Sequence, residues 1–141
     1  MNYEWVNDYI GVPYLVNGRD RNGWDCWGLV MAVLYEQKKL AITDWKVVTT
    51  GSPKANLADS ISRIAESAKE MLNDGRIVQI DKPEDFAIVT IHRHKLPNHV
   101  GIVIAGGVLH CASTNGGTIY EPLGTFQRIH GNLTFWKWAD K

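Results

Sequence analysis

Several features are scarce in this chain of 141 residues, and each scarcity excludes a class of protein. Basic and acidic residues balance at 15 each, so no net positive field favours a nucleic acid or an anionic membrane as partner. No segment approaches the roughly 20 apolar residues that a membrane-spanning helix needs. The first residues, MNYEWVNDYIGVPY, have neither the basic start nor the apolar run of a signal peptide. We therefore expect a protein that is made in the cytoplasm and has no nucleic-acid or membrane partner.

Cysteine is also scarce, because Cys26 and Cys111 are the only two in the sequence. In a reducing compartment, this pair is expected to remain as free thiols rather than to form a disulfide. A free thiol can act as a nucleophile, so the sequence around each cysteine is informative.

Metal-binding cysteine motifs are absent from the sequence, although a histidine-rich run, IHRHKLPNH, precedes the second cysteine. The alternative of a zinc site would draw its ligands from His92, His94, His99, His110 and Cys111. Basic residues surround the first two of these histidines, no Cys-x-x-Cys pair is present, and a loop explains the run more simply. We therefore expect no metal and no other cofactor.

The abundant residues predict one folded unit. Hydrophobic residues make up 45% of the chain, which includes six Trp and has no internal repeat or low-complexity tract. A chain of this length supports one sizeable core but not two. We expect a single domain over residues 1–141, with its functional groups around one site or surface.

Helical periodicity dominates the first half of the chain. A short helix is predicted in the first ten residues from the spacing of Trp5, Val6, Tyr9 and Ile10. A second helix is predicted from Asp25, its N-cap, to about Lys38, with one stripe buried at Leu29, Val30, Val33 and Leu34. The clearest helical pattern spans residues 52–75 and is interpreted as scaffold.

Extended patterns replace helical ones after Gly75. The runs RIVQI, DFAIVTIH, HVGIVIA, GVLHCAS, TIYEP and GNLTFWKW predict short strands separated by Pro, Gly and Asn. Gly106 and Gly107 are expected at the turn of a hairpin in IAGGVLH. Helices first and strands second predict an α+β domain, with the helices packed on one face of an antiparallel sheet.

Cys26 lies where the second helix begins, directly after its predicted N-cap, Asp25. Unpaired N–H groups and the positive end of the helix dipole favour thiolate over thiol at such a position. The same N–H groups could stabilise an oxyanion when the sulfur attacks a carbonyl carbon. This placement predicts a nucleophile, although a free cysteine can also simply be a buried apolar residue.

Two histidines are placed to assist that cysteine. If the strands around the Gly106–Gly107 turn pair, His99 and His110 lie near opposite positions at the open end of one hairpin, with a small register offset. Gly101 would leave space beside the imidazole of His99. The pair predicts a base and its orienting partner, and the plainer alternative is two structural histidines. Cys111 follows His110 and is expected to point to the opposite face, into the core.

Two stretches, YIGVPYLVNGRDRNGWDCWGLV and NHVGIVIAGGVLHCAS, resemble the NlpC family of papain-like cell-wall cysteine peptidases, particularly the small members in phage tail modules. The resemblance implies a papain-like fold, with Cys26 as nucleophile, His99 as general base and His110 as the third polar residue that orients it. Tyr14 matches the family tyrosine whose hydroxyl lies beside the nucleophile, with simple packing as the alternative. Residues 40–75 resemble a helical insertion between nucleophile and base.

The function implied by the resemblance is hydrolysis of an amide in the peptide stem of bacterial peptidoglycan, typically the bond from D-glutamate to a diamino acid. It also implies phage tail proteins as partners and a location in the virion. Two other functions fit the same residues. One is a structural tail-assembly protein that uses the peptidase fold to bind other subunits, and the other is a cysteine acyltransferase or amidase acting on an amide outside the wall.

Overall fold

A computed structural model describes residues 3–42, 77–93, 96–112 and 115–138 of the chain. The helix predicted over residues 52–75, and nearly all of the predicted insertion at residues 40–75, lie outside the described residues. In the N-terminal half, the elements are the 3-10 helix η1 (Glu4–Asp8), the short strands β1 (Arg19–Asp20) and β2 (Gly23–Trp24), and the helix α1 (Cys26–Lys38). In the C-terminal half they are β3 (Ile77–Ile80), β4 (Ile88–Arg93), β5 (Leu96–Ile104), β6 (Gly107–Ala112), β7 (Gly117–Pro122), α3 (Leu123–His130) and β8 (Leu133–Trp138).

Helix α1 begins and ends close to the predicted residues. The Asp25 side chain accepts a hydrogen bond from the backbone N–H of Gly28, as expected of an N-cap, and the helix ends where Lys39 adopts a left-handed conformation. The predicted stripe is buried. The first predicted helix is only a single 3-10 segment, because the chain turns away at Gly11, whose φ is positive, and leaves Ile10 44% exposed.

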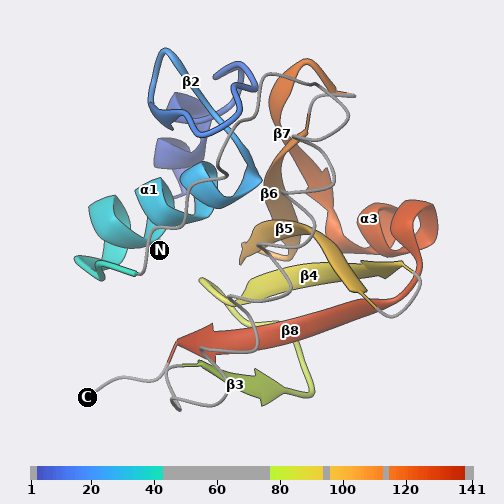
Figure 1. Ribbon diagram of the computed structural model, residues 1–141. Coiled ribbons are helices and arrows are strands. Elements are labelled where there is room, and N and C mark those ends of the chain that lie inside the picture. Colours follow the sequence, from blue (N-terminus) through green and yellow to red (C-terminus); the bar gives the residue numbers. More distant parts are fainter. Residues whose placement is uncertain (1–2, 43–76, 94–95, 113–114, 139–141) are drawn as a thin grey trace.

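The strands form a six-stranded antiparallel sheet in the order β3-β8-β4-β5-β6-β7 (Figure 1). All six predicted extended runs contribute a strand. The turn between β5 and β6 lies one residue earlier than predicted, at Ala105 and Gly106, because Gly107 already pairs with Ile104. Both turn residues have positive φ, which suits the twist of a two-residue hairpin. Asp85 secures this turn by accepting a hydrogen bond from the Ala105 N–H at 2.8 Å.

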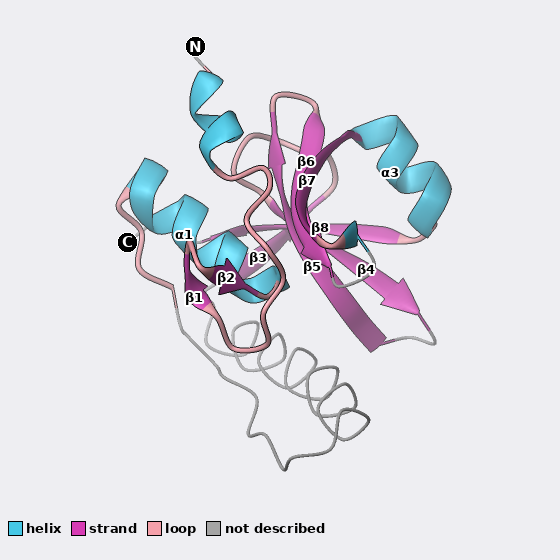
Figure 2. Cartoon of the chain, turned by 90° about the horizontal axis from the view of Figure 1, so that it is seen from above, coloured by secondary structure: helices cyan, strands magenta, loops and turns pink. Residues whose placement is uncertain are grey.

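Two apolar cores lie on opposite faces of the sheet (Figure 2). The α1-face core joins α1 and the N-terminal segment to inward-facing strand residues that include Ile88, Val100, Ile102, Ile104, Leu109, Cys111 and Trp136. The α3-face core consists of Ala87, Val89, Ile91, Val103, Val108 and Phe126. Strand alternation explains the division, because neighbours such as Ile102 and Val103 point to opposite faces. The predicted α+β fold, with N-terminal helices on one face, is confirmed.

Helix α3 was not predicted from the sequence. Its segment, LGTFQRIH, contains a glycine and β-branched residues, and no side chain caps its start. Phe126 is its one buried residue, so packing of this ring under the sheet, rather than intrinsic propensity, accounts for the helix. Within the described part of the chain, no helix is long and apolar enough to cross a membrane.

Candidate active site

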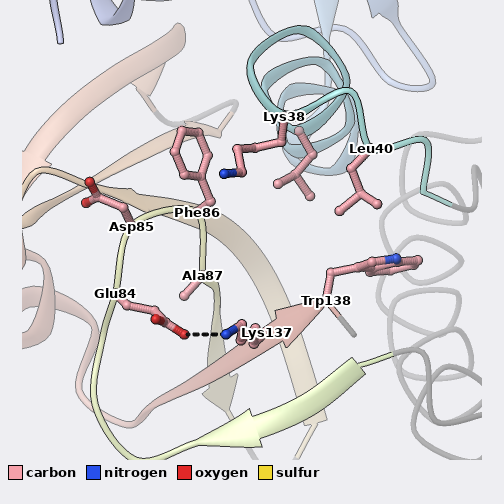
Figure 3. Close-up of a pocket in the computed structure, with 9 residues that line it drawn as sticks. Lys38, Leu40, Glu84, Asp85, Phe86, Ala87, Lys137 and Trp138 are labelled. Carbon is pink, nitrogen blue, oxygen red and sulfur yellow. Dashed lines mark ion pairs between the residues drawn. The ribbon is translucent and has the colours of Figure 1, made fainter. Parts of the chain in front are cut away.

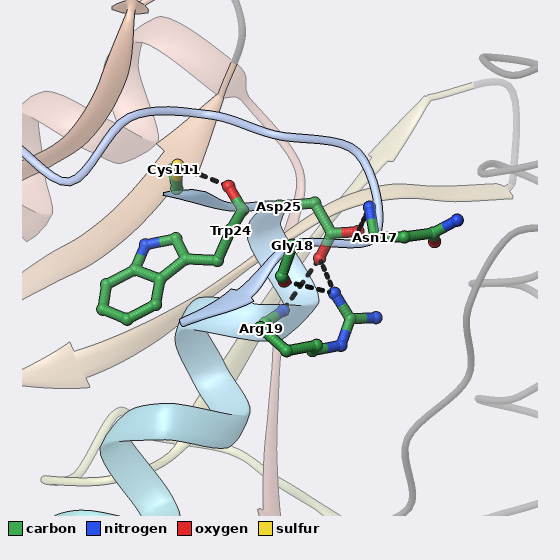
Figure 4. A network of polar contacts seen from close by, with 7 residues as sticks. Asn17, Gly18, Arg19, Trp24, Asp25 and Cys111 are labelled. Carbon is green, nitrogen blue, oxygen red and sulfur yellow. Dashed lines mark hydrogen bonds and ion pairs between the residues drawn. The ribbon is translucent and has the colours of Figure 1, made fainter. Parts of the chain in front are cut away.

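A polar network fixes the loop before α1 to the start of that helix (Figure 4). One carboxylate oxygen of Asp25 accepts hydrogen bonds from the Gly28 N–H at 2.8 Å and from Nη1 of Arg19 at 2.9 Å. The other accepts from the backbone N–H of Asn17 at 3.0 Å. A carboxylate cannot itself stabilise an oxyanion, since it only accepts hydrogen bonds. Asp25 therefore supports the site by holding the helix start and the preceding loop together.

Cys26, the first residue of α1, is only partly exposed and packs against the α1-face core. Burial raises the pKa of its thiol to about 12, and the neighbouring charge of Asp25 adds to the rise. Hydrogen bonds from the backbone of Val100 and Trp27 act in the opposite direction but are outweighed. The expectation that the helix start favours a thiolate is therefore wrong for the free protein. The sulfur carries a proton at neutral pH and needs a base to lose it.

Tyr14 lies close enough to Cys26 for the two groups to interact electrostatically. It forms a bridge with Trp24, just before the helix start, and packs partly buried against the α1-face core. Burial raises the pKa of Tyr14 to about 12, with the nearby Cys26 as the next cause. The phenol therefore remains protonated at neutral pH and can donate a hydrogen bond beside the sulfur.

The second cysteine has the structural role that its position predicted. Cys111 is fully buried in the α1-face core, and its Sγ donates to the backbone carbonyl of Trp24 at 3.4 Å. Its thiol lies on the opposite face of β6 from the ring of His110, as strand alternation requires. The two cysteines thus occupy different environments, one at a helix start and one inside the core.

The two predicted histidines meet across the β5–β6 pair. His110 lies opposite Gly101, so His99 lies two residues before the partner of His110 on β5, which is the small offset that was expected. Nε2 of His99 is 3.2 Å from Nδ1 of His110, and the rings meet edge to face at 80°. The space at Gly101 is not left open, because a Cβ there would lie 2.7 Å from Val108 and 3.1 Å from the Cβ of His110. Glycine at this position lets the His110 side chain pack.

Glu121 is a polar partner that was not identified from the sequence. Its Oε1 lies 2.6 Å from Nε2 of His110. The carboxylate comes from β7, where Glu121 pairs with Val108 and is therefore diagonal to His110 on the same face. The alternation within TIYEP was a usable signal, but the register of this strand against GVLHCAS was not fixed before the structure.

His110 is a buried imidazole in a mixed environment. Its side chain is 1% exposed and packs edge to face on Phe126 of α3, with ring centroids 4.8 Å apart. Burial lowers the pKa of His110, and the nearby His130 lowers it further, whereas Glu121 raises it. The net direction is downward, so His110 is neutral at neutral pH and each of its two nitrogens has a distinct role.

The start of α1 and the histidine pair lie next to each other. The thiol of Cys26 interacts with the backbone of Val100, which immediately follows His99 on β5. A thiol, two imidazoles and a carboxylate therefore come from α1, β5, β6 and β7 in turn. This combination is typical of a cysteine nucleophile with a base and groups that orient the base.

Comparison with known proteins places this arrangement in a family. The model of the NlpC/P60 family matches residues 11–129. The chain belongs to the NlpC/P60 family. It is 25% identical over 136 residues to a protein of Haemophilus influenzae named "Probable endopeptidase". The aligned residues cover 95% of this chain and 69% of that protein.

Two solved structures share the fold of this NlpC/P60 chain. The NlpC/p60 domain of the peptidoglycan hydrolase SagA is 19% identical, with a TM-score of 0.57 over 92% of this chain and 90% of that one. An N-acetylmuramoyl-L-alanine amidase from Bacteroides uniformis is 13% identical, with a TM-score of 0.55 over 96% of this chain and 97% of that one. These similarities confirm the NlpC-type, papain-like fold.

One pocket of about 290 Å³ lies away from the cysteine of this NlpC/P60 chain, at the other end of α1 (Figure 3). The ammonium group of Lys38 lies 5.1 Å from the ring centre of Phe86, and Lys137 pairs with Glu84 at 3.8 Å. Its lining contains neither of the cysteines nor any of the histidines. The candidate active site at the start of α1 is therefore separate from this pocket.

The zinc ligands considered from the sequence do not all lie within the described part of this NlpC/P60 chain. Among the described residues, no group of three or more His, Cys, Asp or Glu side chains is arranged to hold a metal ion. His94, one of the zinc ligands considered from the sequence, lies outside the described residues. His110 instead has both ring nitrogens in contact with His99 and Glu121.

Proposed function

We propose that this chain is a cysteine endopeptidase or amidohydrolase that cleaves an amide in the peptide stem of bacterial peptidoglycan, at the bond from D-glutamate to a diamino acid. The observation that carries the proposal is the 3.2 Å contact between the His99 and His110 rings, beside the helix that begins at Cys26. Family membership supports it, as do relatives whose names include an endopeptidase, a peptidoglycan hydrolase and an amidase.

The first chemical step is removal of the thiol proton. With a pKa of about 12, on the order of one Cys26 thiol in 10⁵ would be ionised at pH 7 without help. His99 takes this proton as general base while the sulfur attacks the amide carbon. The carbonyl oxygen becomes an oxyanion, which backbone N–H groups at the start of α1 can stabilise.

The remaining steps return the enzyme to its starting state. The imidazolium of His99 gives its proton to the leaving amine as the carbon–nitrogen bond breaks, and an acyl-enzyme remains on Cys26. A water molecule, deprotonated by the same His99, then attacks the thioester and releases the acid. His110 holds the ring of His99 through both steps, and the Tyr14 hydroxyl donates a hydrogen bond beside the sulfur.

The test is mass spectrometry of the fragments released from purified peptidoglycan. Wild-type protein should release fragments that end in D-glutamate, and Cys26→Ala should release none. Cys111→Ala is the matched control, because it removes the other thiol, which lies inside the core. Fragment release by Cys26→Ala would contradict the proposal. An amine acceptor added to the same reaction separates hydrolysis from acyl transfer.

We also propose, from the resemblance to small tail-module members, that the protein works in a phage or prophage tail and is carried in the virion. Tryptic peptides of this chain should then be present in purified virions induced from the host. Their absence from virions, together with activity in cell extracts, would contradict a tail location. A purely structural tail protein would instead co-purify with tail subunits and show no Cys26-dependent release.

A further inference from the structure

Three side chains from neighbouring strands form a continuous line of polar contacts, with the buried ring of His110 at its centre. The line runs from His99 on β5 to His110 on β6, with 3.2 Å between nitrogens, and on to Glu121 on β7, with 2.6 Å between Nε2 and Oε1. Each ring nitrogen of His110 has its own partner, so the proton on His110 can be in only one of two places.

We propose that Glu121 is a positioning residue that fixes the protonation pattern of His110 and, through it, makes Nδ1 the basic nitrogen of His99. The family resemblance assigns the cysteine and both histidines, but it assigns no role to Glu121. The turnover part of this inference rests on the proposed function, whereas the protonation pattern is a property of the free protein.

The protonation pattern follows from counting donors and acceptors. A carboxylate can only accept, so Glu121 requires the proton of neutral His110 to be on Nε2. Nδ1 of His110 is then a lone-pair acceptor and takes the hydrogen bond from Nε2–H of His99. Because neutral His99 has one ring proton, its Nδ1 is left unprotonated and able to receive a proton from a thiol.

The opposite pattern would disable the base. Without the carboxylate, His110 could carry its proton on Nδ1 and donate it to Nε2 of His99. The single proton of His99 would then be on Nδ1, the nitrogen that must be unprotonated to act as the base in the proposed mechanism. A wrong tautomer of this kind severely reduces catalysis in the aspartate–histidine–serine triad, where a carboxylate also orients the base.

The negative charge of Glu121 also acts after the proton has moved. When His99 becomes an imidazolium, its Nε2–H still donates to His110, and the carboxylate on the far side of that ring stabilises the positive charge. The His110 ring between the two charges is 1% exposed and rests on Phe126, whereas the Glu121 side chain is 18% exposed. The buried ring reduces the screening of the two charges by solvent.

Other titratable groups lie near His99, His110 and Cys26, and each can affect how the reactivity of the Cys26 thiol depends on pH. His110 is approached by His99, by Glu121 and, from α3, by His130. The thiol of Cys26 is influenced by Asp25 and Cys111, and it in turn acts on Tyr14. A variant at Glu121 removes one carboxylate and leaves every other group of this set in place, so a changed profile reports the loss of Glu121.

The first experiment reads the tautomers directly, without substrate. Nitrogen-15 NMR of histidine-labelled Cys26→Ala protein should show Nε2–H on both His99 and His110. In Glu121→Leu, with the same cysteine replaced, the proton of at least one ring should move to Nδ1. Glu121→Gln should keep the wild-type pattern, because its amide oxygen can still accept. Unchanged tautomers in a folded Glu121→Leu protein would overturn the proposal.

The second experiment measures alkylation of Cys26 by iodoacetamide against pH, in protein carrying Cys111→Ala. Glu121→Leu should slow alkylation at pH 7 by about tenfold or more, and Glu121→Gln should slow it less. Glu84→Gln, which alters a surface carboxylate paired with Lys137, is the matched control and should alkylate at the wild-type rate. Equal rates in Glu121→Leu and Glu84→Gln would overturn the role in activating the thiol.

The two experiments also separate this inference from the proposed function. The wild-type protein could release no peptidoglycan fragments while Glu121→Leu still shows the tautomer shift and slowed alkylation. That result would contradict the proposed substrate but support the positioning role of Glu121. Equal fragment release by wild type and folded Glu121→Leu would contradict the positioning role of Glu121 but support the proposed peptidase activity.

Discussion

The two faces of the sheet bury polar groups in different ways. On the α1 face, the hydroxyls of Thr90 and Thr118 accept hydrogen bonds from indole N–H groups of Trp136 and Trp24, at 2.9 and 2.8 Å. On the α3 face, the buried polar residue is His110, whose partners are His99 and Glu121. The first kind of pair cannot exchange a proton near neutral pH, whereas the second can.

This difference indicates how the fold divides its work. On the α1 face, the helix that begins at Cys26 packs on a large apolar core, and the two buried hydroxyls there make neutral hydrogen bonds. The α3 face, with its smaller core, holds the two histidines and the carboxylate that contact one another. Cys26 lies where the start of α1 meets β5, so a thiol held by one face reaches a base held by the other. The following experiments test that division.

The largest expected effect is on turnover, after removal of the base. His99→Ala should lower kcat/KM for fragment release by about 10³-fold or more, because the thiol of Cys26 has no other group placed to take its proton in the mechanism above. The thermal unfolding midpoint should change little, since His99 is only partly buried. Activity retained within about tenfold would show that the α3 face does not supply the base.

The next effect is on stability alone, through a neutral pair of the α1 face. Thr118→Val removes the acceptor of the Trp24 indole and leaves that N–H buried. Urea denaturation should show a loss of about 1–3 kcal/mol in the free energy of unfolding. The folded variant should keep wild-type kcat, because no titratable group has changed. A large loss of kcat with unchanged stability would contradict the difference drawn between the two faces of the sheet.

A smaller effect is expected from pH, and its sign follows from burial of His110. The pKa of His110 is lowered in the folded protein, so below the usual range near 6.5 the unfolded chain binds the extra proton more readily. Stability should therefore fall as pH drops from 7.5 to 5.5, by at most about 1.4 kcal/mol, because only about one pH unit of this range lies below the usual pKa of histidine. The slope should be shallower in His110→Gln. A steeper slope in that variant would contradict the assignment.

The sequence was sufficient for the elements whose signals are local. Asp25 as an N-cap, the buried stripe of α1 and the alternating strands all follow from periodicity and capping. His99 and His110 could be placed together because a two-residue turn links their strands, although the turn lies one residue earlier than predicted. The family motifs then named their roles, and membership in the NlpC/P60 family is now shown.

What was missed depends on contacts between distant segments. Helix α3 is stabilised by one buried ring, Phe126, and has no strong propensity of its own. Glu121 meets His110 only through the pairing of β6 with β7, which the sequence did not specify. The pKa of Cys26 was misjudged because the helix start is visible in the sequence, whereas the burial that outweighs it is not.

The smallest expected effect is on the stability of the start of α1, where Asp25 caps the helix next to Cys26. Asp25→Asn keeps an oxygen that can cap α1 but loses the charge that pairs with Arg19 at 2.9 Å, where both side chains are mostly buried. The free energy of unfolding should fall by about 1 kcal/mol. Because the negative charge of Asp25 raises the pKa of Cys26, the same change should lower the pH midpoint of iodoacetamide alkylation. Loss of stability and a more acidic thiol should thus appear together, and an unchanged midpoint would show that burial alone sets the pKa of Cys26.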